Sequence, residues 1–233
     1  MSRPTAISAV LPAYNEEANV ARAVAATSAA LRSCCEAYEV IVVDDGSRDG
    51  TGRVLQELTG SEPALRVVRH ATNQGYGAAV RSGFSAARHS WVFLMDCDNQ
   101  FDPAELSLLI DRAADADIVT GYRAVRRDPL PRRLNAWAFF RLVRLLFGSM
   151  PRDVNCAFKL IRRDLLTRLD LRRDGALINT ELYVRARQHH ARVVEVPVHH
   201  FPRTAGKQTG ASPRVILRAF MELLAFRREV KPR

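Results

Sequence analysis

The chain has 233 residues, of which 47% are hydrophobic and 26% charged, and its net charge is +10 at pH 7. This length allows one substantial domain, or one with an appendage, and four cysteines are too few for a disulfide framework, so we expect reduced thiols in a cytosolic protein. No apolar stretch reaches the roughly 18 residues of a membrane span, and the one near the N-terminus is too short for a secretory signal.

Strands and helices are predicted to alternate through the first half of the chain. Short apolar runs predict strands at Ala6 to Leu11, Glu39 to Val43, Leu65 to Val68, Trp91 to Met95 and Asp117 to Thr120. Between them, apolar residues recur at helical spacing. This rhythm predicts an α/β fold with a mostly parallel sheet and helices on both faces.

Two carboxylates one residue apart follow the apolar run Trp91 to Met95. An extended chain turns Asp96, Asp98 and Gln100 to the same side, because side chains alternate along a strand. Three oxygen ligands at the end of a buried strand suit Mg²⁺ or Mn²⁺, which fills its other positions with substrate phosphates and water. An isolated Asp-x-Asp is common, however, and a solvated turn at the end of the strand explains it better unless the rest of the chain supports a site.

Polar side chains also follow the first two predicted strands, at Pro12 to Glu16 and at Asp44 to Ser47. Ligands of open parallel sheets bind outside the carboxyl ends of the strands, so these ends would face one crevice. Acidic clusters at two of the three ends are costly unless a cation compensates them, which favours a metal–ligand site. Neither glycine-rich phosphate fingerprint is present, so ATP hydrolysis and hydride transfer lose support.

The second half of the chain is strongly basic and carries two apolar helical stripes. Residues 1–121 hold 10 basic and 16 acidic side chains, whereas residues 122–173 hold 14 basic and 4 acidic, which indicates an anionic partner on one side. Leu134 to Phe147 predicts either a core helix with snorkelling arginines or an interfacial helix. The apolar helical stripe from Val215 to Phe226 leaves three alternatives: packing on the sheet, binding a partner subunit, or lying on a membrane surface. Val193 to Val198 predicts a further strand.

Seven sequence blocks, in order, resemble family 2 glycosyltransferases, in the branch that includes dolichol-phosphate mannosyltransferase and other polyprenyl-phosphate sugar transferases. They run from about Ile7 to Gly210: LPAYNEE, VVDDGSRDGT, NQGYGAA, DCDNQFDP, GYR, DVNCAFKL and EVPVHHFPRTAGKQTG. The resemblance implies a GT-A fold, a Rossmann-like sheet between helices, over residues 1–210. Residues 1–121 would bind nucleotide and metal, 122–210 would form the acceptor half, and 211–233 an amphipathic helix and tail.

The resemblance also implies roles for single residues. Nucleotide-sugar binding falls on Pro12, Tyr14, Glu16, Asp44, Asp45, Asp96 and Cys97, and metal binding on Asp96, Asp98 and Gln100. Catalytic roles fall on Asp98, Arg123, Arg133 and Asp153, and acceptor-phosphate binding on Arg123, Arg133, Arg203 and Lys207. Two positions depart from the family pattern: Asn99 stands where glycine is commoner, and Tyr76 where lysine is commoner.

The resemblance implies an inverting, metal-dependent transfer from a nucleotide-diphosphate sugar to a polyprenyl phosphate, with Mg²⁺ or Mn²⁺ as cofactor. GDP-mannose is the favoured donor and a UDP-sugar the other option. The enzyme would lie on the cytoplasmic face of the membrane, with a separate membrane protein or a second copy as a further partner. Aromatic residues are scarce in the basic half, which counts against nucleic acid.

Two alternatives remain open. In the first, the chain is a glycosyltransferase whose acceptor is a hydroxyl of a soluble molecule, a protein or a polysaccharide, with Asp153 or Glu181 as general base. Otherwise the chain would be a non-catalytic module that binds an anionic ligand or lipid, with metal-independent binding.

Overall fold

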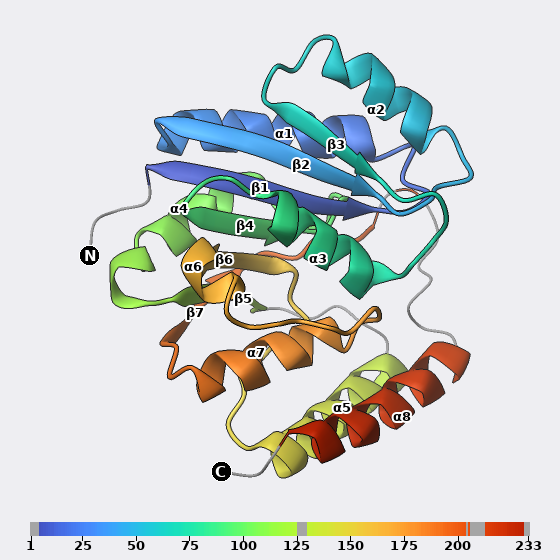
Figure 1. Ribbon diagram of the computed structural model, residues 1–233, viewed down its shortest axis with the longest axis vertical. Helices are drawn as coiled ribbons and strands as arrows, with labels where there is room; N and C mark the ends of the chain where they lie inside the picture. The colour runs from blue at the N-terminus through green and yellow to red at the C-terminus, as the bar shows by residue number, and fades with distance from the viewer. Residues whose placement is uncertain (1–4, 125–129, 204, 206–212, 231–233) are drawn as a thin grey trace.

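Seven strands form one mixed sheet through the centre of the molecule (Figure 1). The computed structural model describes residues 5–124, 130–203, 205 and 213–230, of which 130–137, 139 and 213–220 are described by their backbone alone. The strands are β1 (Ala6–Ala13), β2 (Ala37–Asp44), β3 (Leu65–Arg69), β4 (Trp91–Met95), β5 (Ile118–Arg123), β6 (Phe158–Arg162) and β7 (Val193–Val198). Their order is β3-β2-β1-β4-β6-β5-β7, and β6 alone among them runs antiparallel to its neighbours.

The central strands are apolar along their whole length because both faces of the sheet are covered. All five residues of β4 are buried, as are the last seven of β1. In the register of the sheet, Ala9 of β1 lies beside Val40 of β2 and Phe93 of β4. A parallel sheet buried on both faces requires such continuous hydrophobic runs.

Helices cover both faces of the sheet, as the sequence predicts. One face carries α1 (Val20–Cys34), α2 (Thr51–Thr59) and α4 (Leu106–Ile110), with the short 3₁₀ turns η1 (Pro103–Glu105) and η2 (Ala113–Asp115). The other face carries α3 (Tyr76–Ala86), α6 (Arg163–Leu166) and α7 (Ile178–Gln188). Gly83 lets α3 approach β1 closely, since a Cβ there would lie 2.2 Å from Val10 Cγ1.

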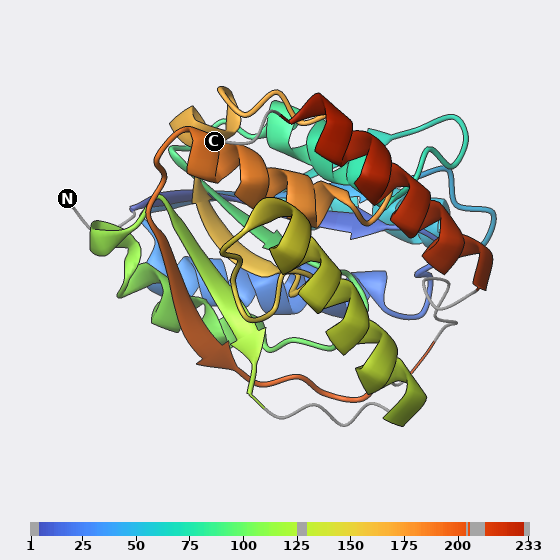
Figure 2. The ribbon, with the colours of Figure 1, turned by 90° about the horizontal axis from the view of Figure 1, so that it is seen from below.

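Two further helices, α5 (Leu130–Phe147) and α8 (Pro213–Glu229), lie side by side beyond α7 (Figures 1 and 2). Their contact includes Phe147 and Phe226, whose ring centroids are 5.2 Å apart. Buried side chains of α7 complete this small core, including Val184. Among the described helices, none is long and apolar enough to cross a membrane.

The order in which strands are added to the sheet changes sides at β1. Strands β2 and β3 follow on one side of β1, and β4 lies on the other. Such a switch point opens a crevice at the carboxyl ends of the strands. Because β6 is antiparallel, the residues that precede it also lie at this edge. The sequence analysis did not identify β6 as a strand.

Candidate active site

Asp96 and Asp98 leave the carboxyl end of β4 and lie at the middle of this edge of the sheet. Asp98 Oδ1 accepts a hydrogen bond from the backbone N–H of Gln100, at 3.1 Å. Between them and Gln100, Asn99 adopts φ +57°, a left-handed conformation that favours glycine and tolerates asparagine. This explains why asparagine is compatible with a position where the family prefers glycine.

The two carboxylates are poorly compensated. Asp96 Oδ1 is buried and has no hydrogen-bond partner among the described residues. Burial, and then the neighbouring Asp98, raise the pKa of Asp96 to about 7, against the opposing charges of Lys159 and Arg123. Burial also raises the pKa of Asp98. Both shifts express the cost of holding negative charge at this place, which a cation would relieve.

A divalent ion therefore fits these residues. An orphaned buried carboxylate oxygen beside a second carboxylate is a suitable start of a coordination sphere for Mg²⁺ or Mn²⁺. In the part of the chain that the structure describes, no group of three or more His, Cys, Asp or Glu side chains could hold a metal ion. The remaining ligands would be donor phosphates and water, as is usual for these ions.

Gln100 joins the Asp-x-Asp loop to the segment after β7. Its side-chain amide donates to the Phe201 carbonyl at 3.0 Å, and the Phe201 N–H donates back to the Gln100 carbonyl at 2.8 Å. The ring of the next residue, Phe101, lies 5.1 Å from the ring of His200. The predicted metal ligand thus holds the 199–203 segment against the carboxylates through its amide nitrogen.

This contact brings Arg203 into the acidic site. Its Nη2 donates to Glu16 Oε1 at 2.5 Å, and its Nη1 lies 3.7 Å from Asp98 Oδ2. Glu16 also accepts from Asn19 Nδ2 at 2.6 Å. Residues from β1, β4 and the segment after β7 therefore meet here, although they are far apart in the sequence.

The residues predicted to bind the nucleoside follow β1 and β2. Pro12 is buried within β1, and Tyr14 is partly exposed just after it. Asp44 ends β2, accepts from the Ser47 N–H at 3.0 Å, and is paired with Arg69, whose Nε lies 3.2 Å from Oδ2.

Asp45 and Cys97 are turned away from this crevice into local structure. Asp45 accepts from the N–H groups of Gln74 at 2.9 Å and Gly75 at 2.8 Å, and its Oδ1 lies 2.6 Å from His70 Nδ1. It therefore holds the loop that leads into α3. Cys97 is 1% exposed, and burial raises the pKa of its thiol well above the usual range.

Arg123 and Asp153 form the second half of the site. Arg123 ends β5 and donates to both oxygens of Asp153, at 2.6 and 2.8 Å. Asp153 lies in the segment before β6, so the antiparallel strand brings it to this edge. Two further residues were predicted to bind the acceptor. Arg133 lies in α5, where it is described by its backbone alone, and Lys207 lies outside the described residues.

Three buried residues behind Asp96 were missed by the sequence analysis as members of the site. Lys159 is fully buried in β6, and its Nζ donates to the Cys156 carbonyl and to Asn179 Oδ1, the latter at 3.0 Å. Burial lowers its pKa to about 8. The Tyr76 hydroxyl is buried beside Asp96 and acts to lower the pKa of that carboxyl. A lysine inside an apolar strand was the signal available in the sequence.

The position of Tyr76 depends on a close backbone contact. The N–H of Gly77 donates to the Asp174 carbonyl at 2.7 Å, and a Cβ at Gly77 would lie 2.3 Å from the Arg173 carbonyl oxygen. Glycine is therefore required where α3 begins against the 173–175 loop.

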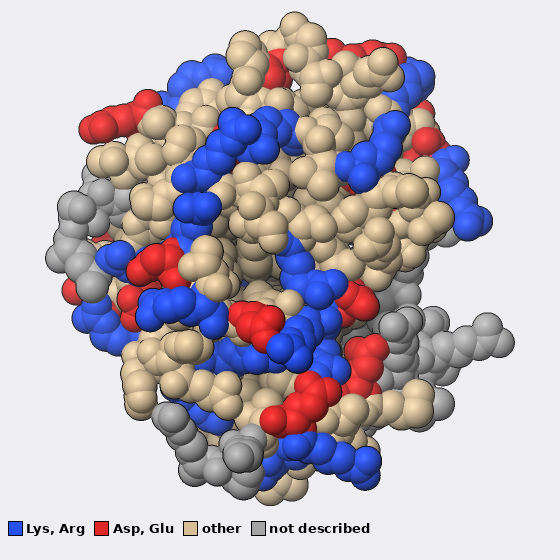
Figure 3. Space-filling model, viewed as in Figure 1, with Lys and Arg blue, Asp and Glu red and all other residues tan. Residues whose placement is uncertain are grey.

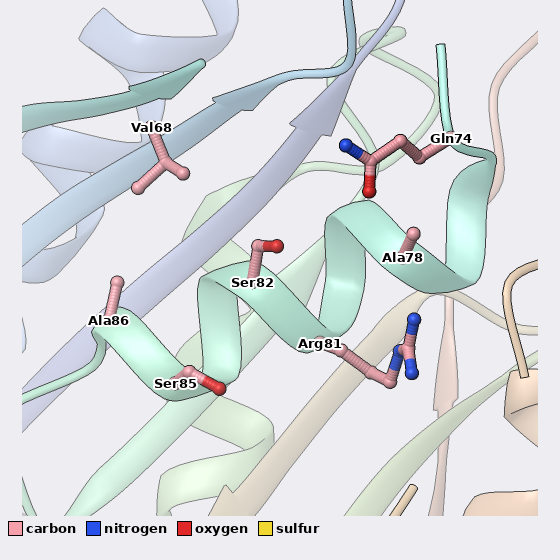
Figure 4. Close-up of a pocket in the computed structure, with 7 residues that line it drawn as sticks. All are labelled: Val68, Gln74, Ala78, Arg81, Ser82, Ser85 and Ala86. Atoms are coloured by element: carbon pink, nitrogen blue, oxygen red, sulfur yellow. The ribbon is translucent and has the colours of Figure 1, made fainter. Parts of the chain in front are cut away.

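A surface hollow along α3 lies away from these carboxylates. It has a volume of about 490 Å³ and runs along the side of α3 (Figure 4). Its lining comes mainly from α3 and includes none of the carboxylates described above: Val68, Gln74, Ala78, Arg81, Ser82, Ser85 and Ala86. We therefore place the candidate active site at the edge of the sheet, on the chemistry of its side chains.

Bacterial lipid-phosphate sugar transferases resemble this chain in sequence. The undecaprenyl-phosphate 4-deoxy-4-formamido-L-arabinose transferase of Pseudomonas paraeruginosa is 32% identical over 213 residues, which are 90% of this chain and 62% of that protein. Its Pseudomonas fluorescens counterpart is 30% identical, over 90% of this chain and 61% of that protein. The chain thus spans less than two thirds of the length of these relatives.

Solved glycosyltransferase structures share the fold. Glucosyl-3-phosphoglycerate synthase from Mycobacterium tuberculosis, in complex with phosphoglyceric acid, superposes with a TM-score of 0.73 at 21% identity, covering 97% of this chain and 81% of that one. Its complex with Mn²⁺, UDP-glucose and phosphoglyceric acid gives the same TM-score, with 80% of that chain covered. These neighbours have the GT-A fold, which confirms the fold predicted from the sequence.

The sequence model described as "Glycosyl transferase family 2" matches residues 8–170. That segment begins within β1 and contains β2 to β6, both carboxylates after β4, and the Arg123–Asp153 pair. The chain belongs to glycosyl transferase family 2.

Proposed function

We propose that this enzyme transfers a sugar from a nucleotide-diphosphate sugar to the phosphate of a polyprenyl lipid, with inversion at the anomeric carbon. The observation that carries the proposal is the meeting of a poorly compensated Asp96–Asp98 pair with the arginines Arg123 and Arg203 at one edge of the sheet. Relatives whose names specify undecaprenyl phosphate support the lipid acceptor.

The donor would lie across the carboxyl ends of β1, β2 and β4. Pro12, Tyr14, Glu16 and Asp44 would contact the nucleoside, while Asp45 shapes the site indirectly through the loop that it holds. The names of the relatives specify a formamido-arabinose and lend no support to GDP-mannose. The donor screen described below identifies the nucleotide and the sugar.

Asp96 and Asp98 would hold Mg²⁺ or Mn²⁺ on the donor diphosphate. Bound there, the ion would stabilise the negative charge that develops on the leaving diphosphate. Gln100 would contribute chiefly by fixing the loop, since its amide nitrogen is engaged with Phe201. The buried Lys159 adds a fixed positive charge behind Asp96.

The state of the two candidate bases favours a phosphate acceptor over a hydroxyl. Asp153 is bound through both oxygens to Arg123. Glu181 is fully buried and accepts from the N–H groups of Arg172 and Arg173. Neither carboxylate is placed to take a proton from a substrate, whereas a lipid phosphate is already anionic at neutral pH and needs no base.

In the proposed step, an acceptor phosphate oxygen attacks the anomeric carbon from the face opposite the diphosphate. The bond from that carbon to the diphosphate oxygen breaks, and the nucleoside diphosphate leaves with the electron pair. Arg123, held rigid by Asp153, would orient the acceptor phosphate and reduce its repulsion from the donor. Arg133 and Lys207 are further candidates for this contact on sequence grounds.

The outer side of the α5–α8 pair would rest on the membrane that contains the lipid. Leu145 is 82% exposed, Met221 59% and Leu224 53%, which is unusual for large apolar side chains. Exposed arginines accompany them, including Arg144 and Arg228. Apolar side chains among arginines suit the interface of a membrane with anionic lipids.

Charge on the described surface is mixed. On the face seen in Figure 3, basic and acidic side chains lie interspersed. Several arginines of the basic half are ion-paired, including Arg172 with Asp170 and Arg173 with Glu229. Such pairing suits local contacts with phosphate and lipid head groups better than a continuous nucleic-acid track.

Donor binding followed by a transfer assay tests this function. Calorimetry with GDP, UDP and their common sugars, with Mn²⁺ or with chelator, should reveal a metal-dependent donor, which is then assayed with undecaprenyl phosphate in detergent. Asp98→Asn should reduce transfer by about 100-fold or more, the effect of losing one transition-state charge stabiliser, with an unchanged circular dichroism spectrum. Full activity in that variant, or transfer in chelator, would refute the metal-dependent mechanism.

A further inference from the structure

Arg203 occupies the acidic site of the substrate-free enzyme. It lies 3.7 Å from Asp98 and 2.5 Å from Glu16, and its Nε donates to the Ala205 carbonyl at 2.6 Å. Its side chain is 14% exposed, and those of Asp98 and Glu16 are 15% and 11% exposed. An arginine predicted to face the acceptor is therefore paired with two acids predicted to serve the donor.

The backbone near Arg203 is anchored, so the guanidinium is the part that can change partners. Two hydrogen bonds between Gln100 and Phe201 fasten the segment to the Asp-x-Asp loop. Among the contacts that Arg203 makes with described residues, the one with Asp98 is the longest and the one with Glu16 is the shortest. Loss of the Asp98 contact alone would leave the other two intact.

We propose that Arg203 is a built-in counter-ion, which neutralises Asp98 until a divalent cation replaces it there. This inference rests on the proposed metal-dependent transfer and adds a competition that the transfer does not require. A single positive charge only partly compensates Asp96 and Asp98, whereas a divalent ion matches both. The exchange is favourable for that reason, and two cations this close would also repel each other.

The exchange would link the two substrates. Once Asp98 is neutralised otherwise, Nη1 of Arg203 is free to donate to the acceptor phosphate while Nη2 stays on Glu16, and charge-assisted hydrogen bonds favour an arginine there. The acceptor contact would thus form after the donor and its metal are in place.

Binding of Mn²⁺ to the 233-residue chain without donor tests this competition, with free Mn²⁺ measured by electron paramagnetic resonance. Arg203→Ala should bind Mn²⁺ roughly three- to tenfold more tightly than the unsubstituted protein, the change expected when one partly screened ion pair is removed. The same variant should transfer sugar more slowly, because it lacks the acceptor contact. Arg203→Met, which keeps the apolar stem, should behave alike and guards against a folding defect.

Arg53→Ala is the matched control, because it removes one exposed arginine that pairs with Glu17 and Glu57 in the same half of the chain. Its Mn²⁺ affinity should equal that of the unsubstituted protein. Equal or weaker Mn²⁺ binding by both Arg203 variants would overturn the inference and leave the proposed function standing. Absence of Mn²⁺ binding in all the proteins, with and without donor, would overturn both.

Discussion

Lys159 shows how a single buried charge can organise one side of the site. Its ammonium donates to the Val154 and Cys156 carbonyls and to Asn179, and it lies 5.6 Å from the centre of the Tyr183 ring. These contacts fix the turn that presents Asp153. Lys159 therefore acts on Arg123 indirectly, because it positions the Asp153 carboxylate to which Arg123 is paired.

Replacing Lys159 with methionine should lower the free energy of unfolding by about 1–3 kcal/mol, because buried carbonyls and Asn179 lose their donor. Urea denaturation followed by circular dichroism measures this change. Arg168→Met is the control, since Arg168 is exposed and its contacts with Asp164, a hydrogen bond to the carbonyl at 3.0 Å and an ion pair at 3.8 Å, lie at the surface; it should change stability by no more than about 0.5 kcal/mol. Equal effects of the two substitutions would contradict the assigned role.

At the residue scale, the sequence predicts which side chains gather at the sheet edge better than it predicts their tasks. Asp44 and Asp45 are adjacent and chemically identical, yet Asp45 is engaged by His70, Gln74 and Gly75. Those partners lie 25 to 30 residues away in the chain. No local pattern contains that information, so the division of labour between the two acids emerged only with the fold.

The elements themselves follow from hydrophobic periodicity where burial is complete. Strands β1, β2 and β4 were predicted to within two residues at each end, because both of their faces are apolar. Strand β6 was missed because Lys159 interrupts its apolar run, and antiparallel pairing leaves no local signature. Periodicity also predicted α5 and α8, but not that each would pack against the other and α7.

The packing of α8 separates its buried side chains from its exposed ones. Leu223 and Phe226 are fully buried against α5 and α7, whereas Leu224 and Met221 remain exposed. An exposed apolar side on a helix that already has its core contacts indicates a second contact surface.

Leu224→Glu should weaken binding to vesicles that contain anionic lipid by about tenfold or more, because it replaces an exposed leucine that would enter the membrane interface with a charged side chain. Sedimentation with the vesicles measures the bound fraction, and thermal unfolding in solution should be almost unchanged. Leu108→Glu is the matched control: Leu108 is 42% exposed but lies on α4, across the sheet from α8. If both substitutions weaken binding equally, or neither does, the α5–α8 surface is not the contact.

At the scale of the whole molecule, the fold places acidic side chains together at one edge of the sheet. This arrangement lowers the stability of the fold but creates a site that can bind a cation. Asp96 and Asp98 come from the most buried strand, so their charges are held where solvation is poorest. A sheet optimised for stability alone would not place carboxylates there. A ligand that neutralises them should therefore also stabilise the fold.

This loss of stability can be measured through Asp96, whose pKa is about 7 in the folded chain because of burial and Asp98. An aspartate in an unfolded chain has a pKa of about 3.9, so the folded state binds this proton more tightly. The resulting stabilisation is complete below about pH 4 and is lost as the pH rises through about 7. Without metal, the melting temperature should therefore fall between pH 5.5 and 8.5, and Asp96→Asn should remove much of that fall.

Differential scanning calorimetry in chelator provides the comparison, with Asp102→Asn as the control, because Asp102 caps the 3₁₀ turn η1 in the same loop. The control should retain the full pH dependence of the unsubstituted protein. Mn²⁺ added at pH 8.5 should restore the melting temperature of the unsubstituted protein and the control, but hardly that of Asp96→Asn, which lacks one ligand charge. Parallel pH profiles in all three proteins would mean that the cost of the acidic edge resides in other groups.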